Sequence, residues 1–294
     1  MMNALYRVRV GDAVRLARGT ADGGPAELLP PETALDRLLA AGGPALRGAL
    51  EGAADGPTPA TAQVLAPVAG QEVWAAGVTF ERSRVARNEE SGRVDHYDKV
   101  YDAARPELFP KAAPGRTRGP GEAIGIRADS DWNVPEPELG LVADAAGRLV
   151  AYTVGDDVSS RSIEGENPLY LPQAKVYTGS CALGPALVPV TDAPPFAELQ
   201  ILLTVRRDGE ELYSDEVPLS GMRRRPEELL GWLFAAMDFP IGVVLLSGTS
   251  IVPPADFTLL PGDDVEVDVP GIGTLRNPVR RVGRPAPVES EAAS

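Results

Sequence analysis

Glycine and proline dominate the local behaviour of this 294-residue chain, which has 31 glycines and 29 prolines. Both residues interrupt regular structure, because the glycine backbone is unrestrained and the proline ring fixes φ and removes the amide donor. They follow no repeating period, so collagen-like and low-complexity sequences are excluded. The composition therefore predicts many turns and short strands rather than long helices.

Alternating apolar residues predict several β-hairpins. One is expected over residues 1–20 and another over 199–217, each with a glycine-containing turn at its centre. Helical spacing is confined to short stretches, one after Pro31 and one after Pro226. These patterns predict an α+β fold in which strands predominate.

The chain divides by composition into a small N-terminal part and a larger remainder. Residues 41–62 are rich in glycine, alanine and proline and are interpreted as a linker. We therefore expect a small N-terminal α+β domain with its linker over 1–65 and a catalytic domain over 66–282. Residues 283–294, rich in proline, glutamate and alanine, are expected to be disordered.

Composition also excludes some partners. A net charge of −14 argues against nucleic-acid binding, because a phosphate backbone would be repelled. No apolar run approaches the length of a membrane span, and the charged N-terminus is unlike a signal peptide. The single cysteine, Cys181, excludes an internal disulfide and fits a reducing compartment. We expect a cytoplasmic protein that binds neither nucleic acid nor membrane.

Three carboxylates and a lysine stand out as candidates for chemistry: Glu136, Glu138, Asp157 and Lys175, all within about forty residues. Carboxylate oxygens suit hard cations such as Mg²⁺, and histidine and cysteine are nearly absent as alternatives. This cluster indicates a magnesium-type site for an oxygen-rich, anionic substrate. The alternative is three solvated carboxylates on an edge strand and a loop.

Local geometry can bring the three carboxylates together. Glu136 and Glu138 are two residues apart, so on an extended strand they share a face. The prolines that flank Glu136 favour a strand at the sheet edge. A hairpin turning near residue 146 would place Asp157 opposite Val134, one diagonal step from Glu136. Asp156 is the alternative ligand, but on a strand end it would point to the other face.

The segment 80–105 is highly charged and is expected to form a helix followed by a mobile stretch that could cover the site. The charge run alone is better explained by a solvated surface helix. The only histidine, His96, is expected to face solvent in this segment.

Several motifs occur in an order that resembles the fumarylacetoacetate hydrolase superfamily over residues 72–282. They are EPELG at 136–140, DDVSSR at 156–161, QAKVY at 173–177, SGTS at 247–250 and LLPGDDVEVDVPGIGTLRNPV at 259–279. The resemblance implies a mostly β fold around a rolled mixed sheet with a small N-terminal domain. It also implies one Mg²⁺ ion, for which Mn²⁺ or Ca²⁺ could substitute, and a homodimer or homotetramer.

Longer stretches resemble the group of 2-keto-3-deoxy-D-arabinonate dehydratases, among them SDWNVPEPELG and SSRSIEGENPLYLPQAKVY. That resemblance implies Mg²⁺-dependent dehydration of 2-keto-3-deoxy-D-arabinonate, a 2-keto acid, to 2,5-dioxopentanoate through a metal-stabilised enolate. Hydrolytic members carry the pattern G-x-N-Y-x-x-H-x-x-E, whose His and Glu activate a water. Here Ser83 and Ala86 stand at those two positions, which disfavours hydrolysis.

Two alternatives stay open. One is a hydrolase, decarboxylase or isomerase of a β-diketo or oxaloacetate-like acid that uses the same metal. The other is a metal-free binding or scaffold protein that keeps the fold.

The resemblance also implies residue roles. Glu136, Glu138 and Asp157 are the expected metal ligands. Lys175 and Glu107 are the expected acid–base pair, in an order that the sequence does not assign. The bland alternatives are a surface lysine for Lys175 and a helix-start glutamate for Glu107.

The expected substrate-binding residues are Phe80, Ser83 and Arg84 at the pocket mouth, Lys111 at the substrate carboxylate, and Arg161 and Thr249 near the substrate. Lys111 could instead pair with Glu107. Surface pairing would account for Arg161, and a turn-forming hydroxyl for Thr249.

Overall fold

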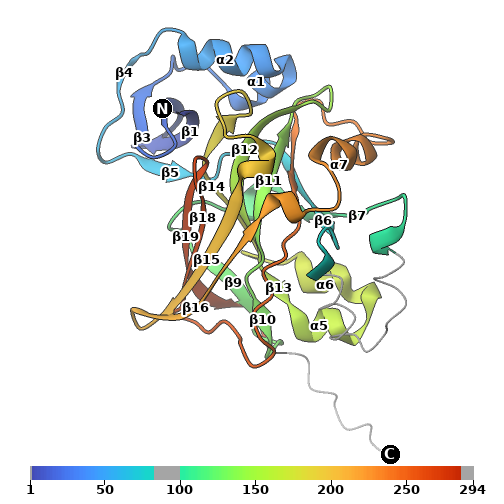
Figure 1. The fold of residues 1–294 in the computed structure, drawn as a ribbon. Helices are drawn as coiled ribbons and strands as arrows, with labels where there is room; N and C mark the ends of the chain where they lie inside the picture. The colour runs from blue at the N-terminus through green and yellow to red at the C-terminus, as the bar shows by residue number, and fades with distance from the viewer. Residues whose placement is uncertain (1, 83–99, 286–294) are drawn as a thin grey trace, which may run out of the picture.

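A computed structural model describes residues 2–82 and 100–285 of the chain (Figure 1). Its largest element is a twelve-stranded mixed sheet, as expected for an α+β fold in which strands predominate. The main path of this sheet runs β4 (Gly56–Pro57), β3 (Gly24–Leu28), β2 (Ala13–Thr20), β1 (Asn3–Val10), β14 (Cys181–Pro189), β12 (Leu149–Asp157), β11 (Pro137–Ala143), β17 (Val243–Leu246), β6 (Glu72–Gly77) and β7 (Glu107–Ala112). Off this path, β5 (Gln63–Leu65) pairs with β1 and β8 (Thr117–Arg118) pairs with β14.

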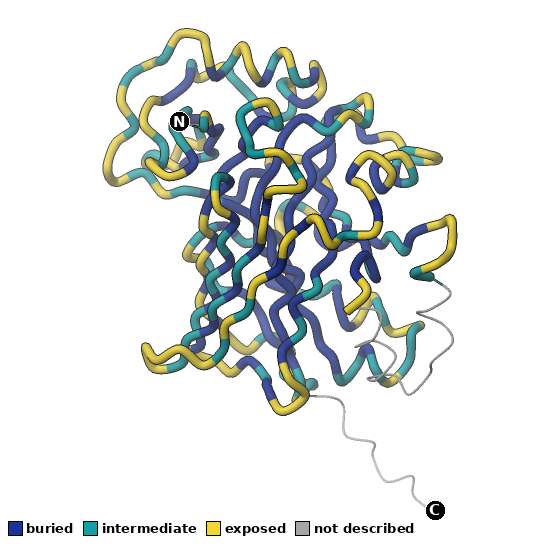
Figure 2. Tube along the Cα trace, viewed as in Figure 1, coloured by how far each residue is buried: buried dark blue, intermediate teal, exposed yellow. Residues whose placement is uncertain are grey.

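A second, five-stranded sheet packs against the first. Its order is β16 (Glu210–Pro218), β15 (Gln200–Arg207), β18 (Asp264–Val269), β19 (Gly273–Val282) and β9 (Ile124–Arg127). Strand β18 alternates, with Val265, Val267 and Val269 buried. Contacts of β18 and β19 with β12, and of β15 with β11, enclose the larger core (Figure 2). A short pair, β10 (Asn133–Val134) and β13 (Ser159–Ser160), lies next to the carboxylate cluster in sequence.

Helices are short, as the glycine and proline content predicts. They are α1 (Leu35–Ala41), α2 (Gly43–Glu51), α5 (Arg161–Glu166), α6 (Leu171–Lys175) and α7 (Pro226–Leu233), with single turns η1 (Pro114–Arg116), η2 (Pro168–Tyr170), η3 (Phe196–Glu198) and η4 (Leu219–Gly221). In the described part of the chain, no helix has the length and apolar character needed to cross a membrane.

The N-terminal region is joined to the rest through both sheet and core. Strand β1 pairs with β14, with Leu5 opposite Leu187. The predicted linker at 41–62 is instead structured, because it contains α2 and β4, and Leu46 is buried in the same apolar cluster as Val150. The division at residue 65 remains a proposal. Most of the predicted disordered tail, residues 286–294, lies outside the described residues.

The hairpin of β11 and β12 has a register two residues from the predicted one. The N–H of Asp157 donates to the carbonyl of Glu136 at 2.9 Å, so Asp157 lies opposite Glu136 rather than Val134. A bulge contributes to this shift, because Val142 pairs with Ala151 whereas the next residue pairs with Leu149. A bulge places an extra residue in one strand and is not visible in the apolar pattern.

Strand β11 is not at the sheet edge, contrary to the prediction from its prolines, because it lies between β12 and β17. Pro137 is tolerated since it is the first residue of β11, and pairing with β17 begins only at Gly140. The charged segment predicted over 80–105 falls largely on 83–99, which includes Ser83, Arg84 and His96 and lies outside the described residues.

Candidate active site

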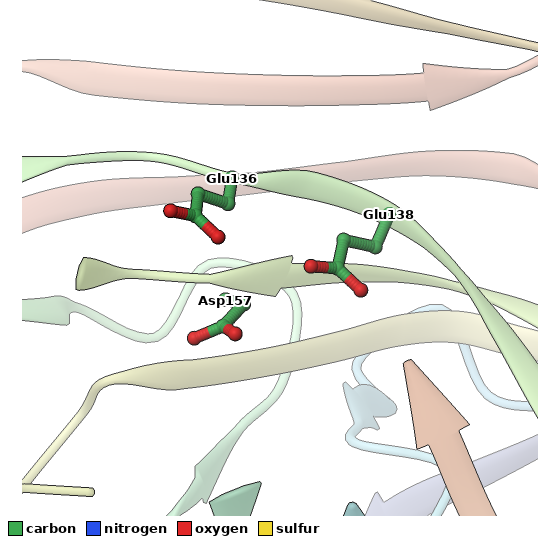
Figure 3. Close-up of side chains that lie close together, drawn as sticks. All are labelled: Glu136, Glu138 and Asp157. Carbon is green, nitrogen blue, oxygen red and sulfur yellow. The ribbon is translucent and has the colours of Figure 1, made fainter. Parts of the chain in front are cut away.

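The structure brings the three predicted carboxylates into one buried cluster. Glu136 precedes β11, Glu138 is the second residue of β11, and Asp157 ends β12. One oxygen of each lies within 4.8 Å of the others, and all three side chains are buried. Figure 3 shows the carboxylates of Glu136 and Glu138 extending towards that of Asp157. Asp156 is not part of this cluster; it accepts the N–H of Glu136 at 2.9 Å.

Two cationic side chains contact the cluster from α5 and α6. Nζ of Lys175 donates to Oε2 of Glu136 at 2.7 Å and to Oγ of Ser159 at 2.6 Å, and lies 3.4 Å from Oδ2 of Asp157. Arg161, the first residue of α5, places Nη2 2.8 Å from Oε1 of Glu136. Both are buried, so these ion pairs are formed away from bulk water.

Strand register places the carboxylate of Glu107 across the pocket from Glu138. Pairing of Gly140 with Leu246 sets Gly248 opposite Glu138, and its N–H donates to Oε2 of Glu138 at 2.5 Å. Continued through β6, the same register brings Gly77 beside Gly248, and Gly77 pairs with Glu107 of β7. Gly248, which follows β17, and Gly77, the last residue of β6, therefore lie between the two carboxylates, and both line the pocket. These two residues are called the glycine row.

These groups share a single pocket with an apolar wall. Phe109, Leu171 and Val252 supply much of that wall, together with Val78. Polar groups come from Thr249, Glu164, Arg161, Glu107, Lys175 and the three clustered carboxylates. A pocket with a few convergent polar groups set against apolar side chains is typical of a small-molecule site.

Two of the predicted substrate contacts lie elsewhere. Lys111 is completely buried behind Asp157, with which it forms an ion pair, so it neither lines the pocket nor pairs with Glu107. Phe80 is 3% exposed and belongs to the larger apolar core, so it does not lie at the pocket mouth in the described structure. Glu107 begins a strand rather than a helix.

Of the remaining predicted contacts, Thr249 and Arg161 line the pocket, whereas Ser83 and Arg84 lie outside the described residues. The hydroxyl of Thr249 also accepts the N–H of Ile251 at 3.1 Å. The turn-forming role and a role at the pocket are therefore compatible. Arg161 lines the pocket while it is paired with Glu136.

The donor set fits a divalent cation with oxygen ligands. Burial raises the pKa of Glu138 well above its usual range, and the neighbouring Asp157 and Glu136 raise it further. Burial is also the main cause that raises the pKa of Asp156 to about 7. A bound cation would relieve this repulsion, because carboxylates that are disfavoured as anions become favourable ligands. Glu136, Glu138 and Asp157 are the residues that would hold it.

Sequence reasoning missed two contributors. The hydroxyl of Ser159 accepts a hydrogen bond from the Lys175 amine, but the sequence indicated Ser159 only as a member of the DDVSSR motif, with no role. The amide of Gly248 binds Glu138, and its position follows from a long-range strand pairing that a local pattern does not contain.

Comparison of the sequence with profiles of known protein families identifies the family of this chain. The profile "Fumarylacetoacetate (FAA) hydrolase C-terminal" matches residues 85–280, which is more than half of the chain. This protein belongs to the fumarylacetoacetate hydrolase family. The match begins after the N-terminal region and spans all three clustered carboxylates and Lys175.

Two relatives with 43–53% identity are named as sugar-acid dehydratases. A protein of Haloferax volcanii named "Probable 2-keto-3-deoxyxylonate dehydratase" is 53% identical over 216 residues, 74% of each chain. The 2-dehydro-3-deoxy-D-arabinonate dehydratase of Saccharolobus solfataricus is 43% identical over 224 residues, 74% of this chain and 75% of that one. A solved 2-keto-3-deoxy-D-arabinonate dehydratase, complexed with magnesium and 2,5-dioxopentanoate, matches with a TM-score of 0.82 and 33% identity, covering 96% of this chain and 100% of that chain.

Proposed function

We propose that this protein is a Mg²⁺-dependent hydro-lyase that dehydrates 2-keto-3-deoxy-D-arabinonate to 2,5-dioxopentanoate. The observation that carries the proposal is one pocket in which a buried carboxylate cluster meets Lys175 on one side and Glu107 on the other. The similar dehydratases named above support the substrate class.

The reaction removes a proton from C3 and a hydroxyl from C4, and successive proton shifts then convert the unsaturated product into the 2,5-dioxo acid. A cation held by Glu136, Glu138 and Asp157 would act as a Lewis acid on the carboxylate and keto oxygens of the substrate. The protein must then supply one group that accepts the C3 proton and one that donates a proton to the leaving hydroxyl.

Lys175 and Glu107 are the two groups proposed for these proton transfers. Nζ of Lys175 is held by Ser159, Glu136 and Asp157, so its position is fixed beside the carboxylate cluster. The carboxylate of Glu107 enters from β7, at the other end of the glycine row. A substrate bound between them would present C3 and C4 to groups on two sides. Each proton-transfer group typically contributes about 10²–10⁴-fold to the rate.

The pocket walls are proposed to exclude water and to orient the sugar acid. Phe109, Leu171 and Val252 would pack against the C3 methylene, whereas Thr249 and Arg161 offer hydrogen bonds to oxygen atoms. Assembly as a homodimer or homotetramer remains a prediction from the family resemblance, and a cytoplasmic location remains a prediction from composition.

The test is turnover of 2-keto-3-deoxy-D-arabinonate by the purified protein, followed by mass spectrometry, with Mg²⁺ or with EDTA. We expect Mg²⁺-dependent loss of one water, abolished in Glu138→Gln. Glu266→Gln is the matched control, because Glu266 lies on β18 and pairs with Arg206 away from the pocket. No turnover despite Mg²⁺ binding would refute this substrate and direct the assay to decarboxylation of oxaloacetate.

A further inference from the structure

Lys111 has an environment unlike that of a substrate-binding lysine. Its side chain is 0% exposed, so the whole of a long charged residue lies inside the protein. A buried ammonium is tolerated only where its donors are satisfied. Nζ pairs with Oδ1 of Asp157 and donates to two main-chain carbonyls, those of Val158 at 3.2 Å and Lys175. Three donors meet three oxygens, which leaves none for a ligand.

Two of these three oxygens belong to residues of the proposed catalytic machinery, Asp157 and Lys175. Asp157 uses Oδ1 for Lys111, while its Oδ2 faces the amine of Lys175. Lys175 is the last residue of α6, and its carbonyl also accepts a hydrogen bond from the hydroxyl of Ser180 at 2.8 Å. The side chain of Lys111 therefore contacts both the carboxylate of an expected metal ligand, Asp157, and the main-chain carbonyl of the proposed proton-transfer residue, Lys175.

Lys111 also connects these groups to the strand that carries Glu107. Glu107 and Phe109 are alternate residues of β7 and share a face. Lys111 is the extra residue of a bulge, because Trp74 pairs with Pro110 and Val73 with Ala112. Glu107 and Phe109 line the pocket, whereas Lys111 is buried, does not line the pocket and reaches Asp157. In the order of the described strands β7 is the last in the sheet, paired with β6. Through Lys111 this outer strand is fastened to β12 and α6.

We propose that Lys111 is a positioning residue, which aligns Asp157 for the metal ion and sets the distance between the proton-transfer groups Lys175 and Glu107. The catalytic part of this role rests on the proposed function, whereas the expected effect of Lys111 on metal binding does not depend on it. Residues that orient metal ligands typically change metal affinity or activity by about 10–100-fold when substituted.

The experiment compares Mg²⁺ binding by calorimetry, without substrate, in the wild type and in Lys111→Met. We expect about 10–100-fold weaker Mg²⁺ binding in the variant, because Asp157 loses the partner that orients it. Lys111→Gln lacks the charge but keeps N–H donors, so its Mg²⁺ binding should be weakened less. This variant serves in place of Lys111→Met if Lys111→Met does not fold. At saturating Mg²⁺ and well below the melting temperature, kcat should fall while KM changes little.

Charge repulsion alone predicts the opposite sign, since removal of a nearby cation would strengthen Mg²⁺ binding. Unchanged or tighter Mg²⁺ binding in a folded variant would therefore overturn the proposal. Arg207→Met is the matched control: it also removes a cation from a buried carboxylate, Asp263, but away from the pocket, so Mg²⁺ affinity should not change. A wild type that binds Mg²⁺ but does not turn over the sugar acid would refute the proposed function and leave the metal-binding test of Lys111 intact.

Discussion

The carboxylate of Glu107 lies directly against Gly77 on the neighbouring strand, and a Cβ atom built on Gly77 would lie 2.1 Å from Oε2 of Glu107. The absence of a side chain at this glycine therefore determines where the carboxylate can be. Because both residues line the pocket, this contact links a backbone position to a group proposed for proton transfer.

Gly77→Ala should displace the Glu107 carboxylate and reduce kcat by about 10–100-fold, part of the range that a proton-transfer group contributes. Mg²⁺ affinity should not change, because Gly77 does not contact the carboxylate cluster. Steady-state kinetics and Mg²⁺ titration separate the two effects. Gly231→Ala on α7 is the control, since a Cβ there meets no atom within 4 Å. Wild-type kcat in Gly77→Ala would exclude a role for the Glu107 position.

Ser159→Ala should reduce kcat without weakening Mg²⁺ binding. The Ser159 hydroxyl donates to the carbonyl of Asp157 at 2.9 Å, so its oxygen is left to accept from Nζ of Lys175. Removal of this acceptor frees the amine to move, and a loss of about tenfold is expected for one hydrogen bond to a charged group. Ser162→Ala serves as the control, because its hydroxyl contacts Ser130 instead. A fall in Mg²⁺ affinity rather than in kcat would argue against this role.

Glu138→Gln should change thermal stability in opposite directions with and without metal. In EDTA, at a pH above the raised folded-state pKa of Glu138, the variant should melt higher than the wild type, because it then removes one of three buried like charges. In Mg²⁺ it should melt lower, because a ligand is lost. Each kcal/mol corresponds to roughly 2–4 °C in a domain of this size. Differential scanning calorimetry measures both conditions, and the same sign in both would contradict the ligand assignment.

The pH dependence follows from the raised pKa of Glu138. A raised carboxyl pKa means that the folded, metal-free protein binds this proton more tightly than the unfolded chain. The stabilisation from this group is therefore present at low pH and is lost as pH rises through the folded-state pKa. Protons also compete with the cation, so Mg²⁺ binding should weaken as pH falls and should release protons. Calorimetry in buffers of different ionisation enthalpy detects that release, and binding that strengthens on acidification would refute it.

Gly248→Ala should destabilise the protein and weaken Mg²⁺ binding. Gly248 has φ of +86°, and a Cβ there would lie 2.1 Å from Oγ1 of Thr79 and 2.9 Å from the carbonyl oxygen of Ala76. The strain is expected to cost about 1–3 kcal/mol. Because the same residue donates its N–H to Glu138, the ligand would shift with it. Unfolding in urea and Mg²⁺ titration test the two effects separately.

Local sequence patterns predicted those features of the site that depend on neighbouring residues. The spacing of Glu136 and Glu138 and the following hairpin brought Asp157 near them, although the register, to which a bulge in β12 contributes, makes Glu136 rather than Val134 its partner. Turn residues likewise identified the hairpin of β15 and β16.

Features that depend on distant strands were not predictable in this way. The pairing of β17 with β11 and β6 places Gly248 and Gly77 between two carboxylates, and no local period encodes it. Lys111 was predicted to bind the substrate carboxylate, and only the packed structure reveals that its ammonium is buried and contacts internal oxygens instead. Lysine is rarely buried, so the sequence contained no indication of this.

The glycine row has one more consequence. Main chain has no rotamers, so the part of the pocket lining that these two glycines form cannot change shape by a side-chain movement when a different molecule enters. Accommodation of a longer or shorter sugar acid must then come from the walls, where Phe109, Leu171 and Val252 have side chains that can be exchanged. We therefore expect the choice of substrate to be made by wall residues that take no part in the proposed chemistry.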